Sequence, residues 1–302
     1  MSPFKVSVII PVYNTAEYLS EAINSILQQS LHEIEIIAIN DGSEDDSLQI
    51  LEELSLQDAR INVISFDKNV GVSVCRNKGI EVARGEFIYF FDSDDILSFD
   101  CLELCYQKML TEEYDFLIFD GVSFYQDNLN SGFNPNYERT QYLKNIDYSG
   151  KEILKELHKH KGYSCSVCLC FIRKEYLTAI KLKFLPGVLY EDVLFTIILY
   201  LSAQKVGFIQ RVFFRRRIRP NSTMTSSISQ KNIDYRLIVC NEILNYKNEF
   251  TDVESKKVLN LEVQNVLKFL IKNLFRSRQI GLLLKNSYDI GFLIFQTFKT
   301  NH

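Results

Sequence analysis

Short apolar runs alternate with helix-like segments over the first 120 residues, and this alternation restricts the possible fold more than any other feature. The apolar runs are VSVIIPV, EIIAIN, INVISF, FIYFF and DFLIFD, at residues 6–12, 35–40, 61–66, 87–91 and 115–120. Helical spacing of apolar residues, or helix-like composition, falls between them over 19–27, 45–54, 72–84 and 99–110. Strands that are apolar on both faces and joined by helices form parallel sheets covered on both sides. The sequence predicts an α/β domain with a doubly wound, mostly parallel sheet.

Polar residues follow each of the first four predicted strands at the same edge of the sheet. They are PVYN, NDGS, DKN and DSDD, at residues 11–14, 40–43, 67–69 and 92–95. Asn14 or Thr15 is also a candidate N-cap of the first helix. Because ligands of such sheets bind outside the carboxyl ends of the strands, we expect a binding site where these residues meet.

The segment 92–95, called the DSDD segment below, concentrates negative charge at one point. Close carboxylates repel one another and require a positive partner, which is a basic side chain, a helix N-terminus or a metal ion. No Gly-rich dinucleotide or P-loop motif is present in the sequence. A D-x-D pair can hold a divalent cation that in turn holds a diphosphate, and Arg76 can add positive charge. These residues predict a metal–diphosphate site.

Three stretches of the chain resemble successive signatures of glycosyltransferase family 2. They are VSVIIPVYNTAEYLSEAINSILQQS, IIAINDGSEDDS and NVGVSVCRNKGIEVARGEFIYFFDSDD. The resemblance covers about the first 120 residues, in order and spacing, and departs at Cys75, where the family more often has alanine. It implies a GT-A fold and an inverting enzyme that uses a nucleotide sugar.

The resemblance also implies roles for individual residues. Those expected along the nucleotide sugar are Pro11, Val12, Asn14, Asp41, Arg76, Asp92, Ser93 and Asp95. Asp41 would accept a hydrogen bond from a uracil imide, and Asp92 would lie near the ribose. Asp94 would be the ligand of a Mn²⁺ or Mg²⁺ cofactor, and Asp95 would lie behind it or face the sugar.

Glu191 and Asp192 precede the apolar run VLFTIILYL, so both are expected at a helix N-terminus. Acids in a first helical turn complement the helix dipole and need no further role. Family members carry a similar Glu-Asp pair whose aspartate is the catalytic base, and an inverting transfer requires such a carboxylate. The resemblance therefore implies that Asp192 is the base and that Glu191 orients the acceptor or the base.

The segment FFRRRIRPNSTM (213–224) contains four arginines in five positions. It is either a solvated basic loop or, by resemblance, a mobile loop that closes over the diphosphate. The sequence does not rank Arg216, Arg217 and Arg219 as ligands. The polar stretch 127–141 is expected to be a variable loop on the acceptor side.

The chain is expected to be helical after residue 229, and 267–299 carries six basic residues and one acid among dense Leu, Ile and Phe. This segment is either a helix pair at a membrane surface or a helical region that packs on the catalytic domain or on another subunit. Cys165, Cys168 and Cys170 lack a second ligand pair and are read as buried cysteines of a strand.

Composition narrows the class of protein. Among 302 residues, 34 Lys and Arg face 38 Asp and Glu, a formal net charge of -4, which argues against a nucleic-acid partner. Neither a signal-peptide pattern nor an uncharged apolar run of the roughly 18 residues needed for a bilayer appears in the sequence. Seven cysteines without an export signal are typical of reduced thiols. We expect a cytoplasmic protein, peripheral at the inner face of the cell membrane if 267–299 contacts lipid.

These inferences combine into one expected organisation. Residues 1–225 form a GT-A catalytic domain, with a nucleotide-sugar half at 1–120 and an acceptor half at 121–225, and residues 226–302 form a helical extension. The expected activity is an inverting, metal-dependent transfer of a sugar, with a UDP-sugar as donor, to a glycan or lipid-linked acceptor in bacterial surface polysaccharide synthesis. The alternatives are a catalytically inactive glycan- or nucleotide-binding module and a sugar nucleotidyltransferase.

Overall fold

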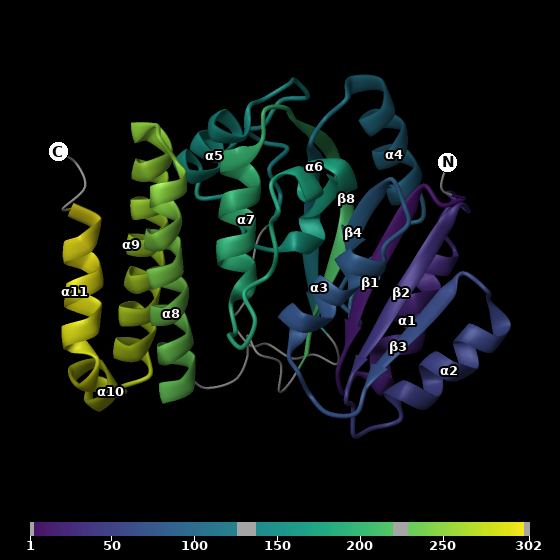
Figure 1. Ribbon diagram of the computed structural model, residues 1–302, viewed down its shortest axis with the longest axis horizontal. Coiled ribbons are helices and arrows are strands. Elements are labelled where there is room, and N and C mark those ends of the chain that lie inside the picture. Colours follow the sequence, from purple (N-terminus) through teal and green to yellow (C-terminus); the bar gives the residue numbers. More distant parts are fainter. Residues whose placement is uncertain (1–2, 126–136, 220–228, 299–302) are drawn as a thin grey trace.

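The computed structural model describes residues 3–125, 137–219 and 229–298, and Figure 1 shows a twisted sheet beside a layer of upright helices. The predicted apolar runs form its first four strands: β1 (Val6–Val12), β2 (Ile34–Asp41), β3 (Ile61–Phe66) and β4 (Phe87–Phe90). These strands pair in parallel. Nearly every residue of β1, β2 and β4 is buried, as expected for strands covered on both faces.

The predicted helices connect these strands, with ends shifted by a few residues: α1 (Ala16–Leu27), α2 (Ser47–Gln57) and α3 (Val72–Val82). Thr15 is the N-cap residue of α1, but its side chain does not cap the helix. Helix α3 approaches β1 so closely that a Cβ on Gly79 would lie 2.3 Å from Cγ2 of Ile9. A glycine at position 79 therefore permits this helix–sheet contact.

The order of the strands reverses at one point of the sheet. The eight strands lie in the order β3-β2-β1-β4-β7-β6-β8-β5. The chain moves outward from β1 to β3 and then returns to the other side of β1 to form β4. The carboxyl ends of β1 and β4 therefore flank a topological switch point, where doubly wound sheets bind ligands.

The second half of the sheet is mixed, which the sequence did not predict. β6 (Phe116–Tyr125) was expected to end the series of strands, but β7 (Cys170–Arg173) inserts antiparallel between β4 and β6. β8 (Val206–Ile218) runs parallel to β6, and the short β5 (Ile96–Leu97) pairs antiparallel with β8 at the edge. The helices of this half are α4 (Cys101–Glu112), α5 (Gly150–Lys159), α6 (Lys174–Ala179) and α7 (Glu191–Ser202).

Two predictions of local structure need correction. The expected basic loop at 213–224 is a strand through Ile218, because β8 pairs with β6 on one side and β5 on the other, and Phe213 and Phe214 are buried. In the expected strand of cysteines, Val167–Leu169 is a 3₁₀ turn, and only the part from Cys170 onward is extended. Residues 220–224, and 127–136 of the predicted acceptor-side loop, lie outside the described residues.

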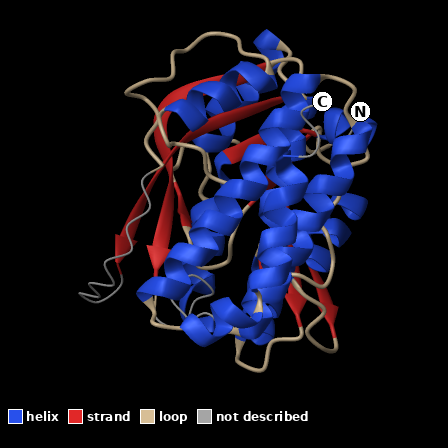
Figure 2. Cartoon of the chain, turned by 90° about the vertical axis from the view of Figure 1, so that its left-hand side faces the viewer, coloured by secondary structure: helices blue, strands red, loops and turns tan. Residues whose placement is uncertain are grey.

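A layer of helices forms the C-terminal part of the described chain: α8 (Gln230–Tyr246), the 3₁₀ turn η2 (Lys247–Glu249), α9 (Val253–Arg276), α10 (Ile280–Lys285) and α11 (Ser287–Phe298). Helix α8 contacts α7, which stands between this layer and the sheet (Figure 1). Seen from that side, the layer lies in front of the strands (Figure 2). Across the described part of the chain, every helix is too short or too polar to span a bilayer.

Candidate active site

The candidate site lies at the switch point between β1 and β4. There the loops after the two strands are tied together, because the hydroxyl oxygens of Thr15 and Ser93 lie 2.9 Å apart and share a hydrogen bond. Val12 is fully buried and Pro11 partly buried at the end of β1, so their side chains form the floor of this edge. The structure thus brings the ends of strands one and four together, as the sequence predicted.

Asn14 and Asp41 hold the loops around this floor. Asn14 adopts a left-handed conformation with φ 50°, and its side-chain oxygen accepts a hydrogen bond from the backbone N–H of Glu44 at 2.8 Å. The buried carboxylate of Asp41 accepts hydrogen bonds from the backbone N–H groups of Val70 (2.6 Å) and Gly71 (3.0 Å) and from the Asn69 amide (3.1 Å). The Cys75 thiol also donates to Asp41, so these donors together occupy the roughly four lone-pair sites of the carboxylate.

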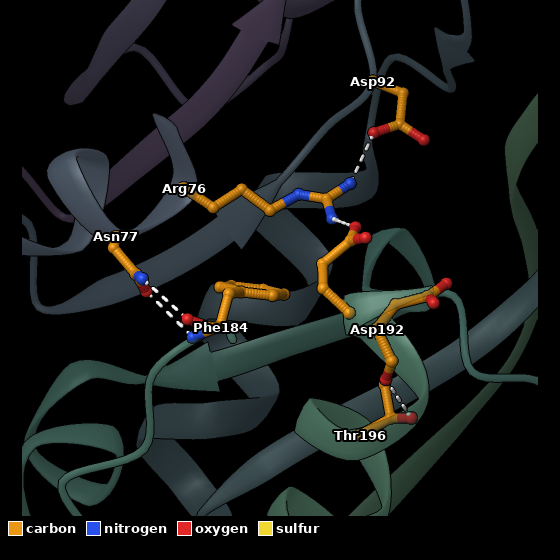
Figure 3. A network of polar contacts seen from close by, with 7 residues as sticks. Arg76, Asn77, Asp92, Phe184, Asp192 and Thr196 are labelled. Carbon is orange, nitrogen blue, oxygen red and sulfur yellow. Dashed lines mark hydrogen bonds and ion pairs between the residues drawn. The ribbon is translucent and has the colours of Figure 1, made fainter. Parts of the chain in front are cut away.

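Arg76 on α3 connects the donor edge to the second half of the chain (Figure 3). One guanidinium nitrogen lies 2.9 Å from Oδ1 of Asp92, and the other lies 2.6 Å from Oε1 of Glu191. The guanidinium also lies over the ring of Phe184, at 5.2 Å, and Asn77 holds the Phe184 backbone by two hydrogen bonds of 2.8 Å. This ion-pair triad, buried except at Asp92, fixes α7 against the carboxyl end of β4.

Arginines of β8 and the residue that follows it neutralise the rest of the DSDD segment. Nε of Arg219 donates a hydrogen bond to Oδ2 of Asp94 at 2.5 Å. The backbone N–H of Arg217 donates to Oδ1 of Asp95 at 2.7 Å, and its side chain pairs with Glu21 on α1 at 2.5 Å. Burial raises the pKa of Asp95 well above its usual value, and the charges of Asp94 and Asp92 raise it further. In this structure the positive partners of the acids are arginines.

Arg216 has a different environment from its two neighbours. Its guanidinium donates to the hydroxyl of the buried Tyr137 at 2.6 Å, and it acts electrostatically on Asp92, Asp95 and Asp192. Arg216 is therefore the arginine of β8 that faces both carboxylate groups. The three arginines expected in this region converge on the predicted acids, although two of them lie in a strand.

Asp192 and Glu191 occupy the first turn of α7, as predicted. The helix begins after Tyr190, which adopts a left-handed conformation with φ 70°. Burial, followed by the charge of Glu191, raises the pKa of Asp192 to about 7, while Arg76 and a hydrogen bond from Cys165 oppose this rise. Burial also raises the pKa of the Cys165 thiol well above its usual value, so the thiol stays protonated and donates. A carboxylate with a pKa near neutrality is suited to general-base chemistry.

The predicted metal site depends on the side chains that could hold a cation. No group of three or more His, Cys, Asp or Glu side chains able to hold a metal ion occurs within 3–125, 137–219 and 229–298. Asp94 offers a partly exposed carboxylate, which is now paired with Arg219. Mg²⁺ is often bound by one or two carboxylates together with substrate phosphates. The residues fit a cation that is held jointly with a diphosphate.

Sequence reasoning missed several contacts of the site. Glu21, Tyr137 and Phe184 lie far in sequence from the acids and carry no motif, so no local signal identified them. Cys165 was interpreted only as a buried cysteine, yet it is partly exposed and contacts Asp192. Its contact with Asp192 joins two distant parts of the chain, so only the tertiary structure reveals it.

The chain is similar to known glycosyltransferases. GlyG of Streptococcus pneumoniae is 28% identical over 92% of this chain and 86% of its own length. A cholesterol galactosyltransferase of Borreliella burgdorferi is 32% identical over 75% of this chain and 63% of its own. Several other curated relatives are longer, and the chain spans 31% of GlyA and 62% of EpsJ.

Solved structures share the fold. The crystal structure of S. aureus TarS 1-349 in complex with UDP-GlcNAc superposes with a TM-score of 0.73 and 21% identity, over 96% of this chain and 79% of that one. The family model of glycosyl transferase family 2 matches residues 7–179, more than half of the chain. The α/β architecture, the GT-A-like neighbours and this match lead to one conclusion: the chain belongs to glycosyl transferase family 2.

Proposed function

We propose that the protein is an inverting glycosyltransferase that moves a sugar from a UDP-sugar to a hydroxyl group of a glycan or lipid-linked acceptor. The observation that carries the proposal is the Arg76 triad, because it joins Asp92 at the donor edge to Glu191, the neighbour of Asp192. The base and the predicted ribose contact are thereby held in one rigid unit. UDP-GlcNAc and UDP in the TarS complexes support a nucleotide-sugar donor.

On the donor side, we assign the nucleotide to the floor formed by Pro11, Val12 and the Asn14 loop. A uracil imide N–H would bind Asp41 by replacing one of its present donors, such as the Asn69 amide at 3.1 Å. Asp92 is half-exposed beside Arg76 and can accept from ribose hydroxyls. These contacts orient the donor so that its anomeric carbon faces the α7 terminus.

Asp94 would hold a Mn²⁺ or Mg²⁺ ion together with the diphosphate. When bound, such an ion supplies positive charge that stabilises the departing diphosphate. Arg219 now pairs with Asp94, so it must exchange this partner for the diphosphate when the donor and cation bind. Arg216 and Arg217 lie close enough to add positive charge to the same edge.

On the acceptor side, Asp192 removes the proton of the acceptor hydroxyl as its oxygen attacks the anomeric carbon. The bond from this carbon to the diphosphate oxygen breaks, and UDP leaves with the electron pair. A single displacement of this kind inverts the anomeric configuration. Glu191, fixed by Arg76, holds the first turn of α7 in place, so that Asp192 meets the acceptor from the face opposite the leaving group.

We further propose that residues 1–225 carry out catalysis and that residues 226–302 attach the protein to a membrane surface. Exposed apolar residues occur along α9, α10 and α11: Phe275, Ile280, Leu284, Tyr288, Phe292, Phe295 and Phe298. Exposed basic residues accompany them, a combination that favours anionic membrane surfaces. Deleting 278–302 should release the protein from anionic vesicles and leave donor hydrolysis intact; retention on the vesicles would contradict this proposal.

The donor assignment can be tested by hydrolysis of a panel of nucleotide sugars in the presence of Mn²⁺. We expect slow hydrolysis of one UDP-sugar that stops when the metal is chelated. Asp94→Asn should weaken donor binding by about two orders of magnitude, since it removes charge that is worth several kcal/mol at a metal site. Asp100→Asn is the matched control, because Asp100 forms a similar ion pair with Arg211 at the surface. UDP affinity that is indifferent to chelator would disprove the metal assignment.

A further inference from the structure

The C-terminal helices place one buried cation behind the proposed base. Arg236 on α8 is only 8% exposed. Its guanidinium lies 3.6 Å from the centroid of the Tyr190 ring and 5.6 Å from that of Phe269 on α9. Tyr190 is the residue that precedes Glu191 and Asp192, so this contact joins the helical layer to the start of α7.

Arg236 differs from the other buried arginines near the site because it has no acidic partner in the described chain. Arg76 and Arg217 both form ion pairs with carboxylates. Across 3–125, 137–219 and 229–298, no carboxylate lies within ion-pair distance of Arg236. Its contacts are a long hydrogen bond of 3.4 Å to the Asn232 carbonyl of its own helix and the face of the Tyr190 ring.

This arrangement is costly for the folded state. A guanidinium cannot lose its proton in proteins, so burial without a counterion leaves its positive charge uncompensated. Burial accordingly lowers the pKa of Arg236. Stacking on Tyr190 holds the planar group in a fixed orientation, which suits bidentate binding of an anion.

The position of Arg236 identifies which substrate would carry that anion. Its guanidinium lies against Tyr190, the residue before Glu191 and Asp192, so it lies beside the first turn of α7, where the proposed base meets the acceptor. The donor diphosphate has its own arginines, Arg216, Arg217 and Arg219, at the DSDD segment. An anion at Arg236 is therefore separate from the donor.

We propose that Arg236 binds an anionic group, a phosphate or a carboxylate, carried by the acceptor saccharide. The proposal rests on the proposed glycosyltransferase function and narrows its acceptor to charged glycans or phosphate-linked saccharides. Arg236 and the Tyr190 ring form the specificity contact, and Asp192 takes the proton of a neighbouring hydroxyl. Neutral saccharides would leave the guanidinium unpaired and bind more weakly.

The test is equilibrium binding to the full chain saturated with UDP and Mn²⁺, which fills the donor site. Glucose 6-phosphate, glucuronate and glucose are titrated separately by calorimetry at low ionic strength. We expect at least one of the two anionic sugars to bind about tenfold or more tightly than glucose, as a charge-assisted hydrogen-bond pair predicts. The phosphate and carboxylate arms show which anion the site takes.

Arg236→Gln should abolish this preference, whereas Arg276→Gln, an exposed arginine of α9, should retain it. Equal binding of charged and neutral sugars to the wild type would overturn the proposal, and so would an unchanged preference in Arg236→Gln. If Arg236→Gln does not fold, Arg236→Lys keeps the charge but loses the planar fork, and an unchanged preference there would also overturn it. Donor hydrolysis is measured separately, so failure of the glycosyltransferase assignment is distinguished from failure of this site.

Discussion

The donor edge and the acceptor side of the site handle buried charge in opposite ways. At the donor edge, Asp92 and Asp94 each pair with an arginine. On the acceptor side, Asp192 has a raised pKa and Arg236 has no carboxylate partner among the residues that the structure describes. A donor therefore has to displace an internal ion pair, whereas an acceptor meets two groups that form no ion pair within the described chain.

Asp192→Asn gives the sharpest test of this comparison. A base acts only while the acceptor oxygen attacks, so this change should lower the transfer rate by about 10²–10⁴-fold and leave affinity for UDP and Mn²⁺ unchanged. The measurements are the transfer rate and the UDP affinity of each variant. Glu191→Gln should retain more activity and weaken acceptor binding first.

The control for this pair is Asp289→Asn, which removes an acid from the first turn of α11 at a distance from the site. If Asp192 only complements the helix dipole, its replacement should change the melting temperature like the control and leave transfer near the wild-type rate. That result would place the base elsewhere.

The donor edge was largely predictable from sequence because local patterns determine it. Buried parallel strands are continuous apolar runs, so β1, β2 and β4 were found with nearly correct bounds. Ligands bind at the carboxyl ends of such strands, so the sequence alone predicted that Asn14, Asp41 and the DSDD segment lie at one edge of the sheet. The structure confirms that these residues lie together, and their individual roles stay predictions.

The acceptor side depends on contacts between distant parts of the chain, which local patterns do not encode. Arg76 and Glu191 are 115 residues apart, and Arg217 and Glu21 are 196 apart. The sequence predicted a loop where β8 lies, because a run of arginines is typical of a solvated segment. The partners of these arginines are distant in sequence: Glu21 on α1 pairs with Arg217, and Tyr137 accepts a hydrogen bond from Arg216. Arg236 had no motif at all, since its burial follows from the packing of α8 on α7.

Glu262 on α9 is another buried carboxyl group without an ion-pair partner in the described chain, and it makes the stability of the fold depend on pH. It is buried with one carboxylate oxygen unpartnered, and burial raises its pKa to about 7, against a small opposing effect of Asn265. The folded protein binds a proton at Glu262 more tightly than the unfolded chain does. The stability that this protonation contributes is therefore fully present below the pKa of the unfolded chain, and it is lost as the pH rises through the folded pKa of about 7. Above that pH the buried charge destabilises the fold.

Glu262→Gln should therefore raise the free energy of unfolding at pH 8 by on the order of 2–3 kcal/mol and change it little at pH 4. Denaturant unfolding at the two pH values measures this difference. Glu254→Gln, at an exposed position of the same helix, is the control and should show no such pH dependence. Equal effects of Glu262→Gln at both pH values would show that the pKa of Glu262 is not raised in the folded protein.

Replacing Cys165 should have the smallest effect of these changes, a shift of the pH–rate profile that depends on one hydrogen bond. Its thiol donates to Asp192 and so favours the ionised form of the base, against burial and the charge of Glu191. Cys165→Ala removes the donor, so the pKa of Asp192 should rise and the acid limb of the pH–rate profile should move to higher pH by up to about one unit. Cys165→Ser restores a donor and should restore the profile, while Cys168→Ala, a buried neighbour in the 3₁₀ turn, should leave it in place. A Cys165→Ala profile that matches the wild type, at any overall rate, would mean that this thiol only fills space beside Asp192.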